Sequence, residues 1–252
     1  MNHTHVEGLA AGNGGASGGR FVGVNPEANL VSVKVLDREG QGNSSDALAG
    51  IQWIIDNKER FNIRVANLSI GTSDAGSLDP LVRAVEAAWD AGIVMVIAAG
   101  NNGPSRGSIT SPGTSRKVIT VGAYDDGNCV DAFGASLVNF SGRGPTSECV
   151  VKPDVLATGC EVISCLSNSP EMSPKRLTML NTIMEHYVKM SGTSMASPAI
   201  AGAISLLLTQ RPHLSPNEVK LAIKHSSTDL FLPPNRQGWG KLDINALLAV
   251  QV

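Results

Sequence analysis

Short apolar runs and helical repeats alternate along the first hundred residues. Residues 30–36, 65–70 and 93–98 are apolar runs rich in β-branched side chains and bounded by turn-forming residues, a pattern typical of buried strands. Residues 46–58 and 80–91 repeat apolar side chains at helical spacing between those runs. This order predicts an α/β chain, with a parallel sheet that is covered by helices on both faces.

The remainder of the chain predicts short strands followed by helices. The clearest strands of the middle third are expected at 118–121, 138–140 and 154–157. Helices are expected at 194–210, from the capping box that begins at Ser215, and at 243–250. Residues 166–186 are interpreted as a polar surface insertion in which a helix could begin at Pro174. Because no linker or repeat divides the sequence, a single domain over residues 1–252 is expected.

The composition of the chain argues against nucleic acid and anionic membranes as binding partners. The 252 residues have a formal net charge of −2 and are 42% hydrophobic, which indicates a globular protein with no strong attraction to nucleic acid or an anionic membrane. The longest apolar stretch, 199–208, is too short to span a bilayer. No secretory signal is visible in residues 1–20, which slightly favours the cytoplasm. Nothing in the sequence specifies an oligomeric state.

The cysteines give no sign of a metal site. Cys129, Cys149, Cys160 and Cys165 contain no C-x-x-C pair, so neither a zinc site nor a thioredoxin-like motif is indicated. Two disulfides are one alternative, but free buried thiols are favoured.

A serine at the mouth of an apolar helix is the sharpest chemical signal. Residues 191–198 surround Ser194 with small side chains directly before a strongly apolar run. At the start of a helix, backbone N–H groups and the helix dipole favour developing negative charge. Ser194 is therefore a candidate nucleophile, and an ordinary helix N-cap is the alternative.

Five motifs in order resemble those of the subtilisin-like serine proteases, the subtilases. Residues 192–198 read G-T-S-M-A-S-P and match the nucleophile motif G-T-S-M-A-x-P of that family. Residues 98–101 resemble its A-A-G-N segment, 67–71 its N-x-S-L-G segment, 140–145 its F-S-S-R-G-P segment and 152–155 its K-P-D-V segment. The resemblance implies a subtilisin-like three-layer fold and a polypeptide substrate.

The resemblance also implies catalytic roles. Ser194 would attack the peptide carbonyl, and the Asn101 amide together with the Ser194 backbone N–H would hold the oxyanion. The residues assigned to substrate binding are Ser69, Ile70, Gly71 and Gly100. No metal or cofactor is expected; some family members bind calcium, but the glycine-rich stretch 12–19 has no carboxylate to hold the ion.

The N-terminus departs from the family pattern. Residues 2–8 align with the histidine motif H-G-T-H-V-A-G, and the catalytic histidine falls on Asn2. The aspartate motif would lie upstream, where this chain has only Met1. An asparagine cannot act as a general base near pH 7, so the triad is broken as written. A fold that lacks its first elements is expected to leave apolar surface exposed.

Several alternatives follow from that departure. His3 is a poor substitute for the base, because adjacent helical residues point about 100° apart. Truncation of an active protease is favoured over a degenerate subtilase, because Asn101 and Ser194 are both retained. The functional alternative to an endopeptidase is a pseudoprotease that holds extended peptides along Ser69–Gly71. Nucleotide binding is disfavoured, because the glycine-rich stretch forms no phosphate loop.

Overall fold

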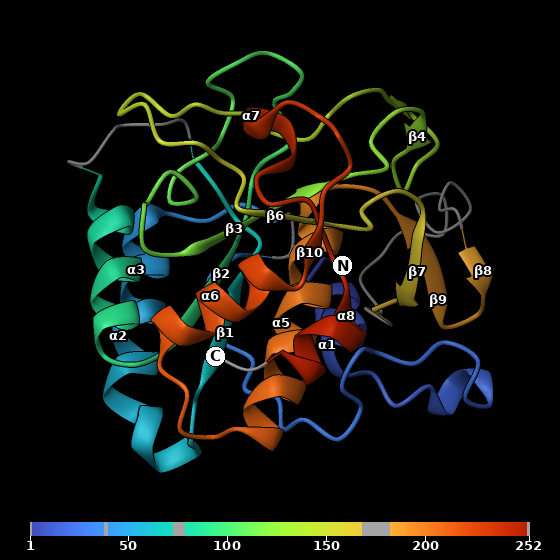
Figure 1. The fold of residues 1–252 in the computed structure, drawn as a ribbon. Helices are drawn as coiled ribbons and strands as arrows, with labels where there is room; N and C mark the ends of the chain where they lie inside the picture. Colours follow the sequence, from blue (N-terminus) through green and yellow to red (C-terminus); the bar gives the residue numbers. More distant parts are fainter. Residues whose placement is uncertain (1, 38–39, 73–78, 168–181, 251–252) are drawn as a thin grey trace.

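The computed structural model describes residues 2–37, 40–72, 79–167 and 182–250 (Figure 1). The helices are α1 (Asn2–Ala11), the 3-10 turn η1 (Gly15–Ser17), α2 (Ser44–Phe61), α3 (Pro80–Asp90), α5 (Thr193–Gln210), α6 (Pro216–His225), α7 (Pro234–Gln237) and α8 (Ile244–Ala249). The strands are β1 (Val65–Leu68), β2 (Val94–Ala98), β3 (Ile119–Ala123), β4 (Cys129–Val130), β5 (Ser136–Leu137), β6 (Val155–Ala157), β7 (Val162–Cys165), β8 (Thr182–Met184), β9 (Tyr187–Met190), β10 (Ser227–Thr228) and β11 (Lys241–Leu242).

A six-stranded sheet forms the centre of the molecule, in the order β1-β2-β3-β6-β11-β10. The first five strands in that order run parallel, and only β10 is antiparallel to its neighbour. Every residue of β2 and β3 is buried, as expected for strands covered on both faces. The predicted parallel α/β architecture is confirmed.

Helices form a layer on each side of the sheet. In Figure 1, α2 and α3 stand on one side of β1 and β2, and α5 and α1 stand on the other. The long helix α5 packs against β1, β2, β3 and β6, while α1 and α8 pack on α5. Because α5 is apolar nearly all round, it lies in the core rather than at the surface. Within the described parts of the chain, no helix combines the length and apolar character needed to cross a bilayer.

Local capping sets the starts of several predicted helices. The Asp79 carboxylate accepts a hydrogen bond from Leu81 N at 2.9 Å, and Pro80 occupies the first turn of α3. Ser215 and Glu218 form a reciprocal capping box at the start of α6. These side chains accept hydrogen bonds from backbone N–H groups that have no partner inside the helix. The predictions of a helix after Asp79 and of a helix after Ser215 are confirmed.

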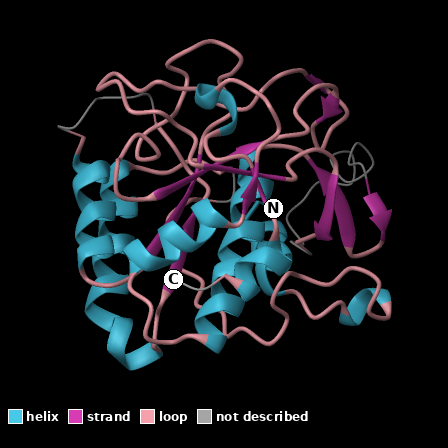
Figure 2. Cartoon of the chain, in the orientation of Figure 1, coloured by secondary structure: helices cyan, strands magenta, loops and turns pink. Residues whose placement is uncertain are grey.

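Two small sheets flank the central one (Figure 2), and they correct one prediction. The strand expected at 138–140 is wrong: β5 lies at Ser136–Leu137 instead. Asn139 takes a left-handed conformation (φ 51°) and donates its N–H to Asp126 O at 2.6 Å, which ends the strand. In the predicted insertion, residues 182–184 form β8, while residues 168–181, including the helix expected from Pro174, lie outside the described residues.

The apolar segment at residues 30–36 is not a buried strand, contrary to the prediction. Among the described residues no strand pairs with it, and Leu30 and Val31 are 53% and 40% exposed. Val33 and Val35 do reach α2, since a Cβ on Gly50 would lie only 2.6 Å from Val35 Cγ1. An apolar run becomes a strand only when another strand accepts and donates its backbone hydrogen bonds, and here that neighbour is missing from the described residues.

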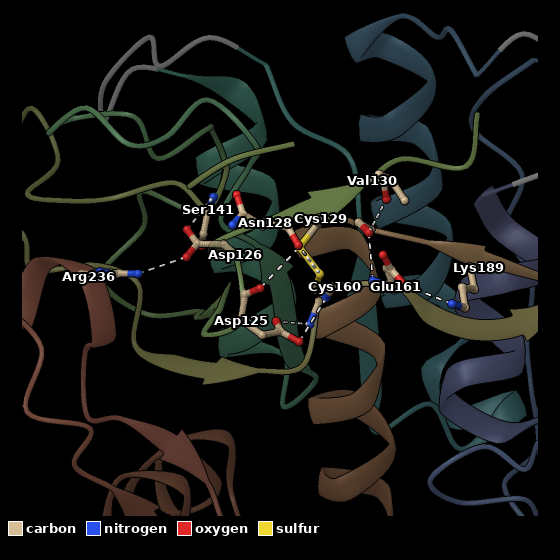
Figure 3. Close-up of a disulfide and its surroundings, with 12 residues drawn as sticks. Asp125, Asp126, Asn128, Cys129, Val130, Ser141, Cys160, Glu161, Lys189 and Arg236 are labelled. Carbon is tan, nitrogen blue, oxygen red and sulfur yellow. Dashed lines mark hydrogen bonds and ion pairs between the residues drawn. A yellow bond between two sulfur atoms is a disulfide. The ribbon is translucent and has the colours of Figure 1, made fainter. Parts of the chain in front are cut away.

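The prediction of four free thiols is also wrong. Cys129 and Cys160 form a disulfide with their Cα atoms 5.6 Å apart (Figure 3), whereas Cys149 and Cys165 are free. The two bonded cysteines lie 31 residues apart in the sequence, at β4 and in the turn between β6 and β7. Only the fold brings them within bonding distance, so spacing alone gave no signal.

Candidate functional site

Residues from separate parts of the chain meet where the parallel strands end. Ser69 follows β1, Gly100 and Asn101 follow β2, and Thr193 and Ser194 begin α5. The carboxyl ends of parallel strands share one edge of a sheet, and α5 starts at that edge. We call these five residues the serine cluster. Hydrogen bonds join Gly100 and Asn101 to Thr193 and join Ser69 to Ser194, and the peptide bond between Thr193 and Ser194 links the two sets.

Thr193 orients the side chain of Asn101. Asn101 Oδ1 accepts hydrogen bonds from Thr193 N at 2.9 Å and from Thr193 Oγ1 at 3.0 Å. Thr193 Oγ1 in turn accepts from Gly100 N at 3.1 Å. Because the amide oxygen is fully used, the amide nitrogen Nδ2 is left as a donor on the opposite side. Sequence reasoning missed this role of Thr193, although its place directly before the serine was a signal.

Gly192 provides the space that Asn101 Nδ2 faces. A Cβ at Gly192 would lie 3.1 Å from that nitrogen, and the backbone there has a φ of 147°, which side-chain-bearing residues rarely adopt. A side chain at this position would therefore crowd the donor. The absence of a side chain at Gly192 keeps the side of Asn101 Nδ2 that faces Gly192 uncrowded.

Ser194 combines a half-buried hydroxyl with a free backbone donor. Its Oγ donates to Ser69 O over a long 3.4 Å. As the second residue of α5, Ser194 has a backbone N–H with no partner inside the helix. The helix dipole adds a partial positive charge at this end, so the surroundings favour an anion.

The Ser69 hydroxyl fastens the first turn of α5 to the end of β1. Its Oγ lies 3.0 Å from Ser197 Oγ and 3.4 Å from Ser194 O. Asn67 Nδ2 donates to the same hydroxyl at 2.9 Å. The contact with Ser197 fixes the helix position independently of the Ser194 hydroxyl.

The other predicted substrate residues lie beside the cluster and not in its hydrogen-bond network. Ile70 is half-buried against the core, and Gly71 is packed so that a Cβ would lie 2.5 Å from Thr110 Oγ1. Directly after them, Thr72 pairs with Ser111 as an antiparallel bridge. The chain is therefore extended and anchored at this edge of the sheet.

Helix α1 carries the histidine-like motif and begins at Asn2. His5 is fully buried, and its Nε2 lies 3.1 Å from Val162 O and 3.2 Å from Val188 O. Since both neighbours are acceptors, Nε2 carries the proton and Nδ1 does not. Burial lowers the pKa of His5 to about 4, so the ring stays neutral and ties α1 to β7 and β9.

No described histidine forms a hydrogen bond with Ser194 Oγ, so the structure does not pair His3 with the serine. His3 Nε2 is buried and has no hydrogen-bond partner. Among the residues described, no group of three or more His, Cys, Asp or Glu side chains could hold a metal ion.

Comparisons with known proteins place the chain in a family. The Peptidase_S8 sequence model, described as the subtilase family, matches residues 2–240. Serine protease AprX of Bacillus subtilis (strain 168) is 43% identical over 251 residues, which cover 96% of this chain and 56% of that protein. Subtilisin DY of Bacillus licheniformis is 33% identical over 229 residues, which cover 90% of this chain and 70% of that protein.

Solved structures agree with the sequence comparison. The S41 psychrophilic protease superposes with a TM-score of 0.73 at 30% identity, over 96% of this chain and 76% of the other. Sphericase gives a TM-score of 0.76 at 27% identity, with the same coverage. The chain spans about half the length of several curated relatives that it matches, AprX among them. The chain belongs to the subtilase family of serine proteases and has the subtilisin-like α/β fold.

Proposed function

We propose that this chain carries the nucleophile and the oxyanion-binding half of a serine endopeptidase. One observation carries the proposal: Thr193 holds Asn101 Oδ1, so that Asn101 Nδ2 faces the space beside Gly192 and Ser194. A turn does not require its asparagine to form two hydrogen bonds to a residue of another element, as Asn101 does with Thr193 at the start of α5. Donors fixed in advance toward a developing negative charge are the main electrostatic contribution in acyl transfer.

The proposed reaction runs through an acyl-enzyme. Ser194 Oγ attacks the peptide carbonyl carbon as its proton passes to a general base. The oxygen of the tetrahedral intermediate then accepts hydrogen bonds from Asn101 Nδ2 and Ser194 N. As the intermediate collapses, the C–N bond breaks, the protonated base gives its proton to the leaving amine, and the acyl group stays on Ser194. A water molecule that loses its proton to the same base then attacks the acyl-enzyme and releases the acid, and the proton returns to Ser194 Oγ. The reaction proposed here uses no metal ion.

The general base is the part of the triad that this chain does not supply. This chain has Asn2 at the position where the family motif has its catalytic histidine. The asparagine side chain cannot take up a proton near neutral pH. We therefore propose that the chain as given is impaired as an enzyme, and that its defect lies in proton transfer rather than in the serine cluster. Polypeptides that lie along Ser69–Gly71 are the proposed substrates.

The test is labelling of Ser194 with a fluorophosphonate, followed by intact mass and peptide mapping. The reagent forms a phosphorus–oxygen bond to an activated serine and releases fluoride. The chain, its Asn2→His variant and the Ser194→Ala variant of each would be compared, with heat-unfolded protein as a control. We expect an adduct on Ser194 that both alanine variants lack. Absence of the adduct from the chain and from the Asn2→His variant would reject the proposal.

A peptide-binding pseudoprotease is the second candidate. It is favoured by Asn2 and by the position of β1 at one edge of the six-stranded sheet, where an extended peptide could add as a further strand. This function predicts peptide binding in the micromolar range that is unchanged by Ser194→Ala, together with no labelling after Asn2→His. Binding measured by calorimetry on the same four proteins separates the two functions.

A further inference from the structure

The Cys129–Cys160 disulfide lies one residue away from contacts that hold the start of α5. It joins β4 to the turn between β6 and β7 (Figure 3). The Asp125 carboxylate fixes the same turn by accepting from Gly159 N at 2.8 Å and from Cys160 N at 3.2 Å. The turn is therefore anchored by one covalent bond and one charged acceptor.

The residue after each cysteine is bonded to Ser191. Ser191 Oγ donates to Val130 O at 2.6 Å and accepts from Glu161 N at 2.9 Å. This one hydroxyl bridges the two chain segments that the disulfide joins. The disulfide and Ser191 thus form a closed ring of contacts beside the serine cluster.

The ring continues to Gly192, which provides the space before Asn101 Nδ2. Gly192 N donates to Gly159 O at 2.8 Å. Gly159 is itself packed closely, since a Cβ there would lie 3.0 Å from Gly192 O. A displacement of the 159–161 turn would therefore also displace Gly192, which lies between this turn and Asn101 Nδ2.

We propose that the Cys129–Cys160 disulfide and Ser191 position the oxyanion-binding site, and that reduction of the disulfide by a dithiol loosens that site. The effect on catalysis rests on the proposed function, whereas the positioning does not. The ring holds Ser191 and Gly192 through backbone groups of residues 130, 159 and 161, so that the site is fixed before substrate arrives.

The redox step needs only an external dithiol. Cys129 is buried at 3% exposure and Cys160 is half-buried, so attack by the first thiolate falls on the Cys160 sulfur. The Cys129 sulfur leaves with the bonding electron pair and takes up a proton. The second thiolate of the reagent then displaces Cys160. The protein gains two thiols, and the reagent becomes a cyclic disulfide.

Hydrogen exchange tests the positioning without any need for catalysis. Oxidised and dithiothreitol-reduced proteins would be compared by mass spectrometry, with alkylation to count free thiols. We expect the Glu161 and Gly192 amides to exchange about tenfold faster after reduction, as for loss of about one hydrogen bond's stabilisation, while β2 is unchanged. The Cys129→Ser/Cys160→Ser variant should behave like reduced protein, and Cys149→Ser should behave like the parent chain.

Ser191 supplies a second variant. Ser191→Ala should raise exchange at Glu161 with the disulfide intact, and Ser191→Thr, which keeps the hydroxyl, should restore protection. Alkylation of four cysteines without reduction, or verified reduction with no change at Glu161 and Gly192, would overturn the proposal.

A parallel measurement of Ser194 phosphonylation separates this proposal from the proposed function. A roughly tenfold slower reaction after reduction, reversed by reoxidation, supports the catalytic part. If labelling is absent in every form while exchange still responds, the proposed function fails and the positioning stands. If labelling occurs at the same rate in both redox states, the catalytic part of the inference is rejected.

Discussion

The serine cluster and the apolar segment 30–36 are both anchored on the central layers, but by different forces. Asn101, Thr193 and Ser69 form closed hydrogen-bond circuits between strand ends and the first turn of α5. The segment 30–36 offers mainly apolar side chains, which lie against α2 at Val33 and Val35 and are exposed at Leu30. Polar circuits fix geometry because each donor requires one acceptor, whereas apolar contacts alone leave backbone groups unpaired.

This difference separates the two halves of the expected active site. The half that binds an oxyanion is built from groups that position one another. The half that would supply the base has Asn2 at the position of the family's histidine. The apolar segment is a separate case of a missing neighbour, since no strand among the described residues pairs with it. Each of the following changes affects one side of this comparison.

Asn101→Ala should have the largest effect. Removal of the corresponding amide in subtilisin lowers turnover by about 10²–10³-fold, and we expect the same range for phosphonylation of Ser194 in the Asn2→His background. Asn102→Ala is the matched control, because Asn102 is the adjacent exposed asparagine and has no bond to Thr193. Equal rates for the two variants would remove Asn101 from the site.

Acid should weaken the attachment of α1 through His5. The folded-state pKa of about 4 lies below the usual 6.5, so the unfolded chain binds more protons between these values. The contribution of His5 is complete above pH 6.5 and is lost as the pH falls toward 4, a decrease of about 3 kcal/mol. Urea unfolding across this range should lose part of its pH slope in His5→Gln. Asn102→Ala, at an exposed residue that does not titrate, should keep the slope.

Thr193→Val should have a smaller effect on the serine cluster. The substitution removes the hydroxyl that donates to Asn101 Oδ1 and accepts from Gly100 N, but the backbone bond from Thr193 N remains. A loss of about tenfold in the phosphonylation rate is expected, equivalent to about one hydrogen bond. Thr193→Ser keeps the hydroxyl and should retain most of the rate. A similar loss in both variants would point to packing instead.

Leu30→Ser should have the smallest effect. Leu30 is 53% exposed, and surface substitutions usually change stability by less than about 0.5 kcal/mol. Ile97→Ala in the buried strand β2 is the contrast and should cost about 2–5 kcal/mol. A large cost at Leu30, measured by urea unfolding, would mean that the apolar segment is covered in solution.

Sequence reasoning succeeded where the determining contacts are local. Asp79 and the Ser215 capping box place helix starts from neighbouring residues, and the continuous apolar run of β2 identifies a buried strand. The motifs also singled out Asn101 and Ser194, and the structure bonds Asn101 to Thr193, the residue directly before Ser194. The catalytic roles of both residues remain predictions.

It failed where a distant partner decides the outcome. The apolar segment has strand-like composition, but composition does not supply the neighbouring strand. The Cys129–Cys160 pair depends on how β4 meets the β6–β7 turn. The position of Thr193 directly before the serine was a local signal, but its bonds to Asn101 also depend on the distance between the end of β2 and the start of α5, which the sequence pattern does not specify.

The pH profile of Ser194 phosphonylation in the chain and its Asn2→His variant tests the central claim most directly. If the serine cluster is complete and position 2 lacks a general base, Asn2→His should raise the rate about 10²-fold, the lower end of the usual range for general base catalysis. The gain should develop as the pH rises through about 6.5, where an imidazole loses its proton. An unchanged rate at every pH, with Ser194→Ala unlabelled in both backgrounds, would contradict the account.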